Sequence, residues 1–274
     1  MKRFAAVLMG LALVGTFGTA ALAAAPADTL AEAKKKGVLV AGVKDSLPPF
    51  GYVDEKSREI VGYDIDFVKA IARKLNVKLE LKPVTSASRM PQLTEGNIDI
   101  IAATMTKNPE RAKQIGFSHT YFATGQKFIT NKGKVKSLKD LEGKKIGTAK
   151  GSTSEQNVKT AIPTATVLAF DDYPQAFLAL QQGKVAAVTT DEAILAGILA
   201  KAPNKAKFEI PPVQISNEPY GLGMRKDDAK FIAFVDKTIL EMEKSGEAKK
   251  IFEKWFGKGT DFQLKRTFKI TADK

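Results

Sequence analysis

Short apolar runs alternate along the chain with longer segments whose apolar residues recur at helical spacing. Residues 37–43 form the first apolar run. Residues 62–76 follow with apolar side chains on one helical face and Asn76 as the expected stop. Residues 77–84 then alternate between apolar and polar positions, as a half-buried strand does. A strand, a helix and a second strand in this order are typical of a parallel sheet with helices on its faces.

The same alternation continues and restarts near the middle of the chain. Two amphipathic helices follow at the C-terminal end, and their aromatic residues at helical spacing indicate packing in the core or between domains. Two such series predict two α/β lobes. The further expected strands are 98–104, 127–133, a run ending at Gly151, 165–170 and 185–191. The further expected helices are 89–96, a short helix before the strand that ends at Gly151, 152–162, 173–184, 192–201, 231–242 and 248–256.

An apolar run at the N-terminus has the features of a secretory signal peptide. Two basic residues precede the apolar residues 4–23, which end in an A-x-A sequence. We expect residues 1–25 to be removed, with cleavage near Ala23 or Ala25. The chain contains no cysteine, which excludes lipid attachment through cysteine and disulfide bonds. The sequence therefore predicts a soluble exported protein, most simply periplasmic, with roughly 250 residues for one or two domains.

The chain is strongly basic, but its charge pattern is not that of a nucleic-acid-binding protein. The formal net charge is +13, and it becomes +11 without the basic pair of the leader, since 41 basic residues then face 30 acidic ones. The lysines are spread in short clusters, without interleaved aromatic residues or a nucleic-acid-binding motif. Most are expected to be solvated surface residues, and a basic surface of this kind favours small anions or an acidic partner.

Residues 103–111, ATMTKNPER, place two hydroxyl groups and an arginine directly after an apolar strand. One interpretation is ordinary helix capping by Thr104 and Thr106, with Arg111 pointing into water. The other is a cradle for an anion, because a guanidinium group and hydroxyl donors together match a carboxylate. These nine residues alone leave both interpretations open.

Polar residues also follow the other predicted strands. In open parallel sheets, ligands bind beyond the carboxyl ends of the strands. The residues there include hydroxyls, cations and one well-placed carboxylate, a set that suits a zwitterion with an additional negative group. They are Lys44, Ser86–Arg89, Thr104–Thr106, Gly151–Thr153, Asp171–Tyr173 and Asp191.

Four segments, in order along the chain, resemble the periplasmic substrate-binding proteins of polar amino-acid ABC importers, which form family 3 of the bacterial extracellular solute-binding proteins. They are GYDIDFVKAIARKL, TKNPERAKQIGFSHTYF, SLKDLEGKKIGTAKGSTSE and PYGLGMRKDD. The resemblance covers the mature chain. Three further segments, PVTSASRMPQL, KGSTSE and DEAILAG, are most similar to the glutamate/aspartate-binding branch.

The resemblance implies a type II periplasmic-binding-protein fold, an α/β fold with two lobes that are each a mostly parallel sheet flanked by helices. Two crossover strands, near Tyr121–Gln126 and Ser216–Tyr220, would join the lobes. Residues 26–122 with 220–274 would then form lobe 1, and residues 123–219 would form lobe 2. The resemblance also implies a monomer without a cofactor, which closes on an amino acid and delivers it to an inner-membrane ABC permease.

The resemblance also assigns roles to the residues after the strands. In this family the residues that match Thr104, Thr106 and Arg111 bind the ligand α-carboxylate. Ser152 and Thr153 would add donors at the start of a helix, where the helix dipole attracts anions. The cradle interpretation of ATMTKNPER is therefore the one that the resemblance favours.

The remaining site residues would bind the ammonium group and the side chain of the ligand. Asp191 would accept from the α-ammonium group, and it is also placed to cap the helix that follows. Lys44, Ser86 and Arg89 would face the ligand side chain, where a hydroxyl between two cations favours a second carboxylate, and hence L-glutamate or L-aspartate. The glutamate/aspartate branch often has arginine in place of Lys44 and histidine in place of Tyr173. Lysine lacks the guanidinium fork, and a solvated loop lysine is the alternative for Lys44.

Other classes of function stay open beside this one. A binding protein for glutamine or a similar amino acid is the first alternative, and a periplasmic dehydratase of the same fold is the second. The only histidine, His119, lies beside a crossover, and the chain has no cysteine, no metal-ligand cluster and no Walker A loop. A receptor domain would be indicated by a transmembrane or signalling segment. We expect a binding protein that is not an enzyme and needs no metal.

Overall fold

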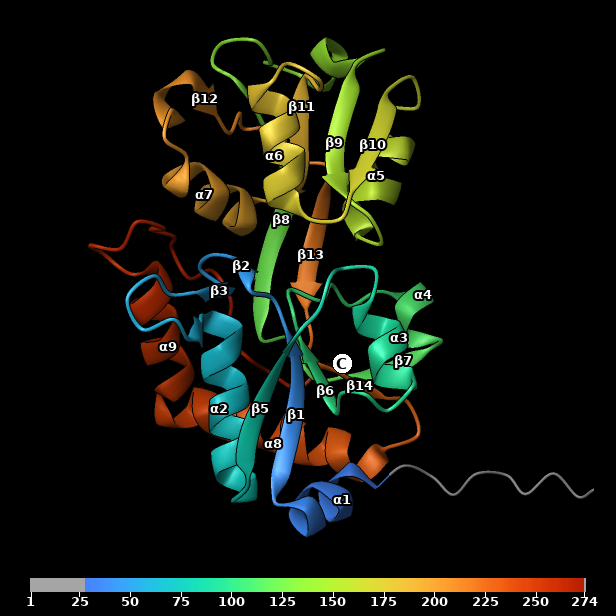
Figure 1. The fold of residues 1–274 in the computed structure, drawn as a ribbon, viewed down its shortest axis with the longest axis vertical. Helices are drawn as coiled ribbons and strands as arrows, with labels where there is room; N and C mark the ends of the chain where they lie inside the picture. Colours follow the sequence, from blue (N-terminus) through green and yellow to red (C-terminus); the bar gives the residue numbers. More distant parts are fainter. Residues whose placement is uncertain (1–27, 274) are drawn as a thin grey trace, which may run out of the picture.

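The computed structural model describes residues 28–273, so the predicted signal peptide lies outside the described residues. Two α/β lobes lie one above the other along the longest axis, and strands β8 (Phe122–Asn131) and β13 (Ser216–Tyr220) pass between them (Figure 1). The predicted two-lobed α/β fold is confirmed. No helix in the described part of the chain is long and apolar enough to cross a membrane.

Lobe 1 is built on a five-stranded sheet in the order β5-β1-β6-β14-β7. β1 pairs in parallel with β5 and β6, whereas β14 pairs antiparallel with β6 and β7. The chain supplies β14 on its return from lobe 2, and this strand makes the sheet mixed. The bounds are β1 (Val38–Val43), β5 (Lys78–Pro83), β6 (Ile100–Ala102), β7 (Ile115–Phe117) and β14 (Gly223–Arg225).

Lobe 2 is built on a sheet in the order β10-β9-β11-β8-β12, with β13 also paired to β8. β9 pairs in parallel with β10 and β11, and β8 pairs antiparallel with β11, β12 and β13. Both sheets are therefore mixed rather than mostly parallel, because the segments that connect the lobes join them as antiparallel strands. The bounds are β9 (Lys145–Ala149), β10 (Thr166–Phe170), β11 (Ala187–Asp191) and β12 (Phe208–Glu209).

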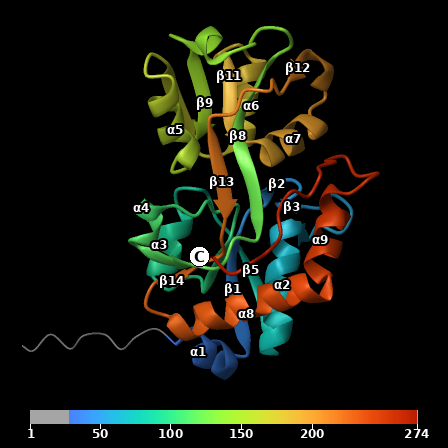
Figure 2. The ribbon, with the colours of Figure 1, turned by 180° about the vertical axis from the view of Figure 1, so that it is seen from behind.

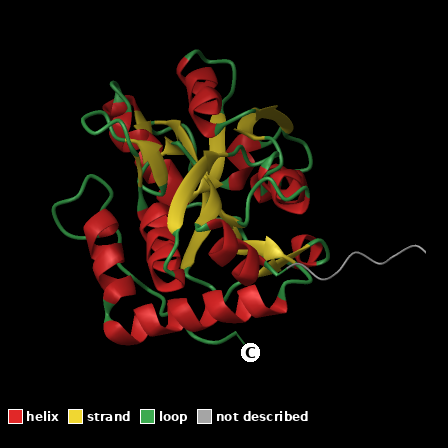
Figure 3. Cartoon of the chain, turned by 60° about the horizontal axis from the view of Figure 1, so that its bottom comes forward, coloured by secondary structure: helices red, strands yellow, loops and turns green. Residues whose placement is uncertain are grey.

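Helices surround the strands of both lobes (Figure 3). α2 shows how the sequence sets a helix: its apolar stripe is buried, and Asn76 ends it in the left-handed conformation with a φ of 59°. The helices are α1 (Thr29–Lys36), α2 (Tyr63–Leu75), α3 (Arg89–Thr94), α4 (Pro109–Ala112), α5 (Thr153–Ala161), α6 (Tyr173–Gln181), α7 (Glu192–Lys201), α8 (Ala229–Ser245) and α9 (Glu247–Phe256), with 3-10 turns η1 (Leu138–Leu141) and η2 (Lys205–Lys207).

The two crossover strands form one antiparallel pair. Their register runs from Phe122 opposite Tyr220 to Gln126 opposite Ser216. Figures 1 and 2, seen from opposite sides, show both strands running from one lobe to the other. The predicted crossover segments coincide with this pair. The lobe boundaries, 26–122 with 220–274 and 123–219, stay a prediction, since they cut continuous strands.

Buried aromatic rings fix the crossover pair to lobe 1. Phe122 of β8 stacks on Tyr220 of β13 with ring centroids 5.5 Å apart. Phe256 of α9 and Phe268 of the C-terminal segment lie 5.2 and 5.3 Å from the ring of Phe122. Phe50 contacts Phe122 from a third, small sheet of β2 (Ser46–Leu47), β3 (Gly51–Val53) and β4 (Ile60–Val61). The aromatic residues of the C-terminal helices thus pack in the core, as predicted.

Candidate functional site

The predicted site residues lie where the two lobes face each other, just after strands or at the starts of helices. Their four charged side chains are at most 9% exposed, so neighbouring protein atoms set the charge state of each. Lobe 1 provides Lys44, Ser86, Arg89, Thr104, Thr106 and Arg111, and lobe 2 provides Ser152, Thr153, Tyr173 and Asp191.

The ATMTKNPER segment does not cap α4 with threonine. Asn108 is the N-cap, and its side chain accepts from the backbone N–H of Arg111 at 2.9 Å. The guanidinium group of Arg111 is buried and donates to the carbonyl oxygen of Thr106 at 2.8 Å and to that of Gly151 at 3.2 Å. The interpretation of threonine capping with a solvated Arg111 is therefore wrong. Burial lowers the pKa of Arg111 below its ordinary value, and nearby anions oppose that shift.

Arg89 and Thr104 form a second part of the lobe 1 wall. Thr104 has a φ of 49°, and its backbone N–H donates to Asp64 at 2.9 Å. Arg89 donates through Nη1 to the carbonyl oxygens of Ala103 and Thr104, and its Nε has no partner among the described residues. Burial, and next the charge of Arg111, lowers the pKa of Arg89 to about 9. A buried cation with an unused donor is suited to an anionic group of a ligand.

Lys44 faces a small interlobe cavity of about 180 Å³. It is 5% exposed and donates to the hydroxyl of Ser86 at 3.1 Å, so the solvated-lysine alternative is wrong. Burial, and next the charge of Arg89, lowers the pKa of Lys44 well below its ordinary value. Tyr173 of lobe 2 closes the same cavity, and Asp45 and Asp172 also line it. The cavity is therefore lined by a buried lysine amino group whose hydrogen-bond partner is a hydroxyl rather than a carboxylate.

The start of α5 forms one part of the lobe 2 wall. The hydroxyl of Ser152 caps this helix, accepting from the N–H of Glu155 at 3.4 Å and donating to the carbonyl of Ala149 at 2.6 Å. The hydroxyl of Thr153 donates to Glu218 at 2.9 Å and lies 3.5 Å from the hydroxyl of Thr106. The two threonines meet across the cleft, and Glu218 on crossover strand β13 holds one of them.

Asp191 ends β11 and provides the carboxylate of the lobe 2 wall. It occupies the N-cap position of α7, but its side chain makes no capping hydrogen bond. The hydroxyl of Tyr220 donates to its Oδ2 at 2.5 Å, and its Oδ1 has no partner among the described residues. Burial, and next the charge of Glu218, raises the pKa of Asp191 to about 7. A buried carboxylate oxygen without a hydrogen-bond partner among the described residues fits a cationic group such as an ammonium.

The two lobes touch closely around these residues. A Cβ at Gly151 would lie 2.8 Å from the Cα of Ala87, and a Cβ at Gly197 would lie 1.7 Å from the carbonyl oxygen of Pro48. Both contacts join lobe 2 to lobe 1, and glycine is needed because a larger residue would collide with backbone. The structure therefore shows the lobes closed against each other.

Three functional neighbours were missed by the sequence analysis. Asp64 accepts from the hydroxyl of Tyr121 at 2.6 Å as well as from the backbone N–H of Thr104. From β13, Tyr220 donates to Asp191 and Glu218 accepts from Thr153. Asp64 lies in the quoted family segment at the start of α2, and Tyr220 lies in another quoted family segment and at the end of a predicted crossover, which were the available signals.

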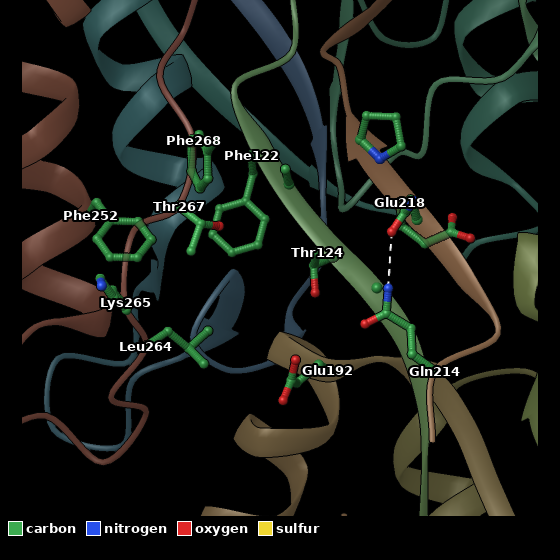
Figure 4. A pocket seen from close by; sticks show the side chains of 14 residues that line it. Phe122, Thr124, Glu192, Gln214, Glu218, Phe252, Leu264, Lys265, Thr267 and Phe268 are labelled. Carbon is green, nitrogen blue, oxygen red and sulfur yellow. Dashed lines mark hydrogen bonds between the residues drawn. The ribbon is translucent and has the colours of Figure 1, made fainter. Parts of the chain in front are cut away.

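A second cavity, of about 470 Å³, lies on another side of the crossover pair. Phe122 and Thr124 of β8, Glu218 of β13 and Phe268 of the C-terminal segment line it (Figure 4). None of the predicted site residues lines it, and the buried cations of the interlobe site lie elsewhere. Among residues 28–273, no group of three or more acidic, histidine or cysteine side chains is placed to hold a metal ion.

Comparison with known proteins shows extended similarity. The family described as bacterial extracellular solute-binding proteins, family 3, matches residues 39–258. The glutamine-binding protein GlnH of Bacillus subtilis is 39% identical over 83% of this chain and 84% of its own. The glutamate/aspartate import solute-binding protein of Escherichia coli is 35% identical over 93% and 89%. The crystal structure of AncCDT-1, an ancestral amino acid-binding protein described as a precursor of cyclohexadienyl dehydratase, is 34% identical over 84% and 100%, with a TM-score of 0.76.

Proposed function

The chain belongs to the bacterial extracellular solute-binding proteins of family 3, and from this premise we propose that it captures L-glutamate or L-aspartate outside the cytoplasm. The amino acid binds between the lobes, the lobes close on it, and the monomer delivers it to an ABC importer in the inner membrane. Named relatives bind amino acids and serve ABC transport or import, which supports the coarser part of this proposal.

The backbone groups of the amino acid bind to opposite walls. Arg111 of lobe 1 presents its guanidinium group beside Thr106, and together they receive the α-carboxylate. Asp191 of lobe 2 presents its free Oδ1 to the α-ammonium group. Thr153 of lobe 2 adds a second hydroxyl group, 3.5 Å from the hydroxyl of Thr106. These groups accept any amino acid, because every one carries both charges.

The observation that supports an acidic side chain is the buried ammonium group of Lys44. Its hydrogen bond goes to Ser86, and burial makes its charge costly unless an anion joins it. A ligand carboxylate in the 180 Å³ cavity would supply that anion, with the unused Nε of Arg89 as a further donor. Asp45 and Asp172 line the same cavity and reduce this preference without removing the buried cation.

Glutamine is the second candidate ligand, and a specific observation favours it. The glutamine-binding relative is 39% identical to this chain, whereas the glutamate/aspartate-binding relative is 35% identical. An amide would place its oxygen toward Lys44 and its nitrogen toward Asp45 or Asp172. The choice between the two ligands depends on whether Lys44 is charged in the complex.

We propose binding without chemical turnover. The raised pKa of Asp191, about 7, would also suit a general acid, and the AncCDT-1 structure is described as a precursor of a dehydratase. No second acid–base group is hydrogen-bonded to the free oxygen of Asp191 among the described residues. Recovery of unchanged ligand after prolonged incubation with the protein is the expected result.

Calorimetric titration of ligand-free, refolded protein with the twenty amino acids tests the proposal. We expect L-glutamate or L-aspartate to bind more tightly than L-glutamine. Lys44→Met should reduce the preference for the acid by at least about tenfold, because a buried charged hydrogen bond is lost. Lys78→Met, an exposed lysine at the start of β5, is the matched control and should change nothing. If the wild type binds glutamine as tightly as the acidic amino acids or more tightly, the acidic assignment is wrong and glutamine is the ligand.

A further inference from the structure

The end of lobe 2 farthest from lobe 1 carries an unusual density of lysine. We call this surface the distal lysine edge. All of its lysines are exposed. They lie in the segment after β8, in η1, just before and at the start of β9, before β11, and in η2. They are Lys132, Lys134, Lys136, Lys139, Lys144, Lys145, Lys184, Lys205 and Lys207.

The sheet topology brings these separate segments to one edge. β9 and β11 run parallel and begin at this edge, while β8 runs antiparallel to β11 and ends there. Backbone hydrogen bonds tie the segments together, from the N–H of Lys132 to the carbonyl of Lys207 at 2.9 Å and from the N–H of Ala186 to the carbonyl of Lys145 at 2.8 Å. Figure 1 shows β9 and β11 running downward from the top of the upper lobe, at the other end of the molecule from α1.

The positive charge of the distal lysine edge is not neutralised locally. None of its nine lysines forms an ion pair within the described residues. The acidic residues there are Asp140, Glu142 and Glu209, which leaves an excess of six positive charges. Asp140 accepts from the backbone N–H groups of Lys136 and Ser137, and Glu209 accepts from the N–H of Gly133. These two carboxylates therefore stabilise the turns through backbone N–H groups and form no ion pair with the lysine side chains.

Lobe 1 contains both paired and unpaired lysines. Lys74 pairs with Glu241 at 2.8 Å, and Lys254 pairs with Asp66 at 2.7 Å. Lys230 pairs with Asp28 at 3.0 Å at the other end of the molecule. Other exposed lysines of lobe 1, such as Lys34, Lys35 and Lys78, form no ion pair within the described residues. The distal lysine edge is therefore distinguished by the number of lysines that it gathers and by their net charge, and not by the lack of ion pairs alone.

We propose that the distal lysine edge binds reversibly to an anionic phospholipid surface. Lysine near such a surface contributes about 1 kcal/mol per residue, without a shaped pocket. A specific protein interface would need a dry apolar or aromatic centre, often with arginine. Within the described residues the large exposed apolar side chains are Val53 and Leu178, and neither belongs to this edge. A diffuse row of lysines matches a continuous charged surface better than a compact protein site.

Vesicle co-sedimentation of the full mature chain tests this inference. The vesicles contain phosphatidylcholine with phosphatidylglycerol, and pure phosphatidylcholine serves as the reference. The test variant carries Lys132→Glu, Lys134→Glu and Lys136→Glu. The matched control carries Lys34→Glu, Lys35→Glu and Lys36→Glu in α1, which makes the same change of net charge at the opposite end of the molecule. Amino-acid binding by both variants shows that they are folded.

We expect the wild type to bind the anionic vesicles only, and to lose binding as added salt shortens the Debye length. The distal variant should partition at least about tenfold more weakly, whereas the α1 variant should stay within about twofold of the wild type. Equal losses in both variants would overturn the proposal, because net charge alone would then explain binding. Retention on immobilised poly-L-glutamate without binding to the vesicles would also overturn it, in favour of an acidic protein partner.

Discussion

The two walls of the interlobe site carry opposite charges and hold them in different ways. On lobe 1, Arg111 and Arg89 are buried cations whose guanidinium groups donate to backbone carbonyl groups. On lobe 2, Asp191 is a buried carboxylate with one oxygen bound to Tyr220 and the other without a partner within the described residues. Neither the two arginines nor Asp191 forms an ion pair within the described residues, although the buried carboxylate of Asp64 lies near Arg89 on lobe 1. A ligand that carries both signs therefore gains from each wall and stabilises the closed arrangement.

Removal of the cation from the lobe 1 wall should have the largest effect. Arg111→Ala should weaken binding of every amino acid, because all of them carry an α-carboxylate. The loss of a desolvated charged hydrogen bond costs about 2–5 kcal/mol, roughly 30- to several-thousand-fold in affinity. Calorimetry measures the loss, and Lys113→Ala, an exposed neighbour, is the control. A folded Arg111→Ala protein with unchanged affinity would show that this side chain only supports the loop.

Removal of the charge from the lobe 2 wall should have the next largest effect. Asp191→Asn should weaken binding by about 1.5–3 kcal/mol, roughly 10- to 150-fold, since the amide keeps an acceptor but loses the charge. Asp171→Asn, on the exposed surface before α6, is the control. If Asp191→Asn binds as tightly as the wild type, the ammonium group of the ligand has another partner.

The same variant should make the ligand-free protein more stable at higher pH. The pKa of Asp191 is about 7 in the folded protein against an ordinary value of 3.8. The folded state therefore binds more protons between these values, and its stability decreases as pH rises through this window. Asp191→Asn removes that dependence. Its melting temperature should exceed that of the wild type by more at pH 8 than at pH 5, and an equal difference at both would contradict the raised pKa.

A variant that keeps the two lobes from touching should weaken ligand binding even though every charged side chain stays in place. Gly197→Ala places a Cβ against the carbonyl oxygen of Pro48, so the closed arrangement must shift. Overpacking of this kind costs about 1–3 kcal/mol, roughly 5- to 150-fold in affinity. Alanine also suits the helix α7, so the melting temperature without ligand should not fall. Normal affinity in this variant would mean that the ligand does not need the walls to meet here.

The smallest expected effect is a shift in the pH dependence of binding. In the proposed binding mode the α-ammonium group needs ionised Asp191, so affinity should fall about tenfold per pH unit below about 7. Glu218→Gln removes the neighbouring charge that helps to raise this pKa, and the decrease in affinity should begin at lower pH. Titration across pH measures both curves. A variant with weaker binding but an unchanged midpoint would show that Glu218 acts only by holding Thr153.

Strand ends and short motifs are local features, so the sequence could single out Lys44, Arg111 and Asp191, and the structure places all three as buried side chains. Their roles in binding a ligand were implied by the family resemblance and stay a prediction. Asn108 competes with Thr106 for the helix cap, and only the folded backbone shows that Asn108 makes it. Glu218 was missed because it reaches Thr153 across 65 residues of sequence, from a strand whose pattern shows no chemistry. Long-range contacts of this kind have no periodic signal.

Small-angle scattering with and without ligand tests the central claim most directly. The claim is that one ligand joins the cationic wall of lobe 1 to the acidic wall of lobe 2. We predict that saturating L-glutamate reduces the radius of gyration of the ligand-free wild type. Asp191→Asn should require much more ligand for the same change. Equal radii of gyration for the wild type with and without saturating ligand would contradict closure of the two walls on the amino acid.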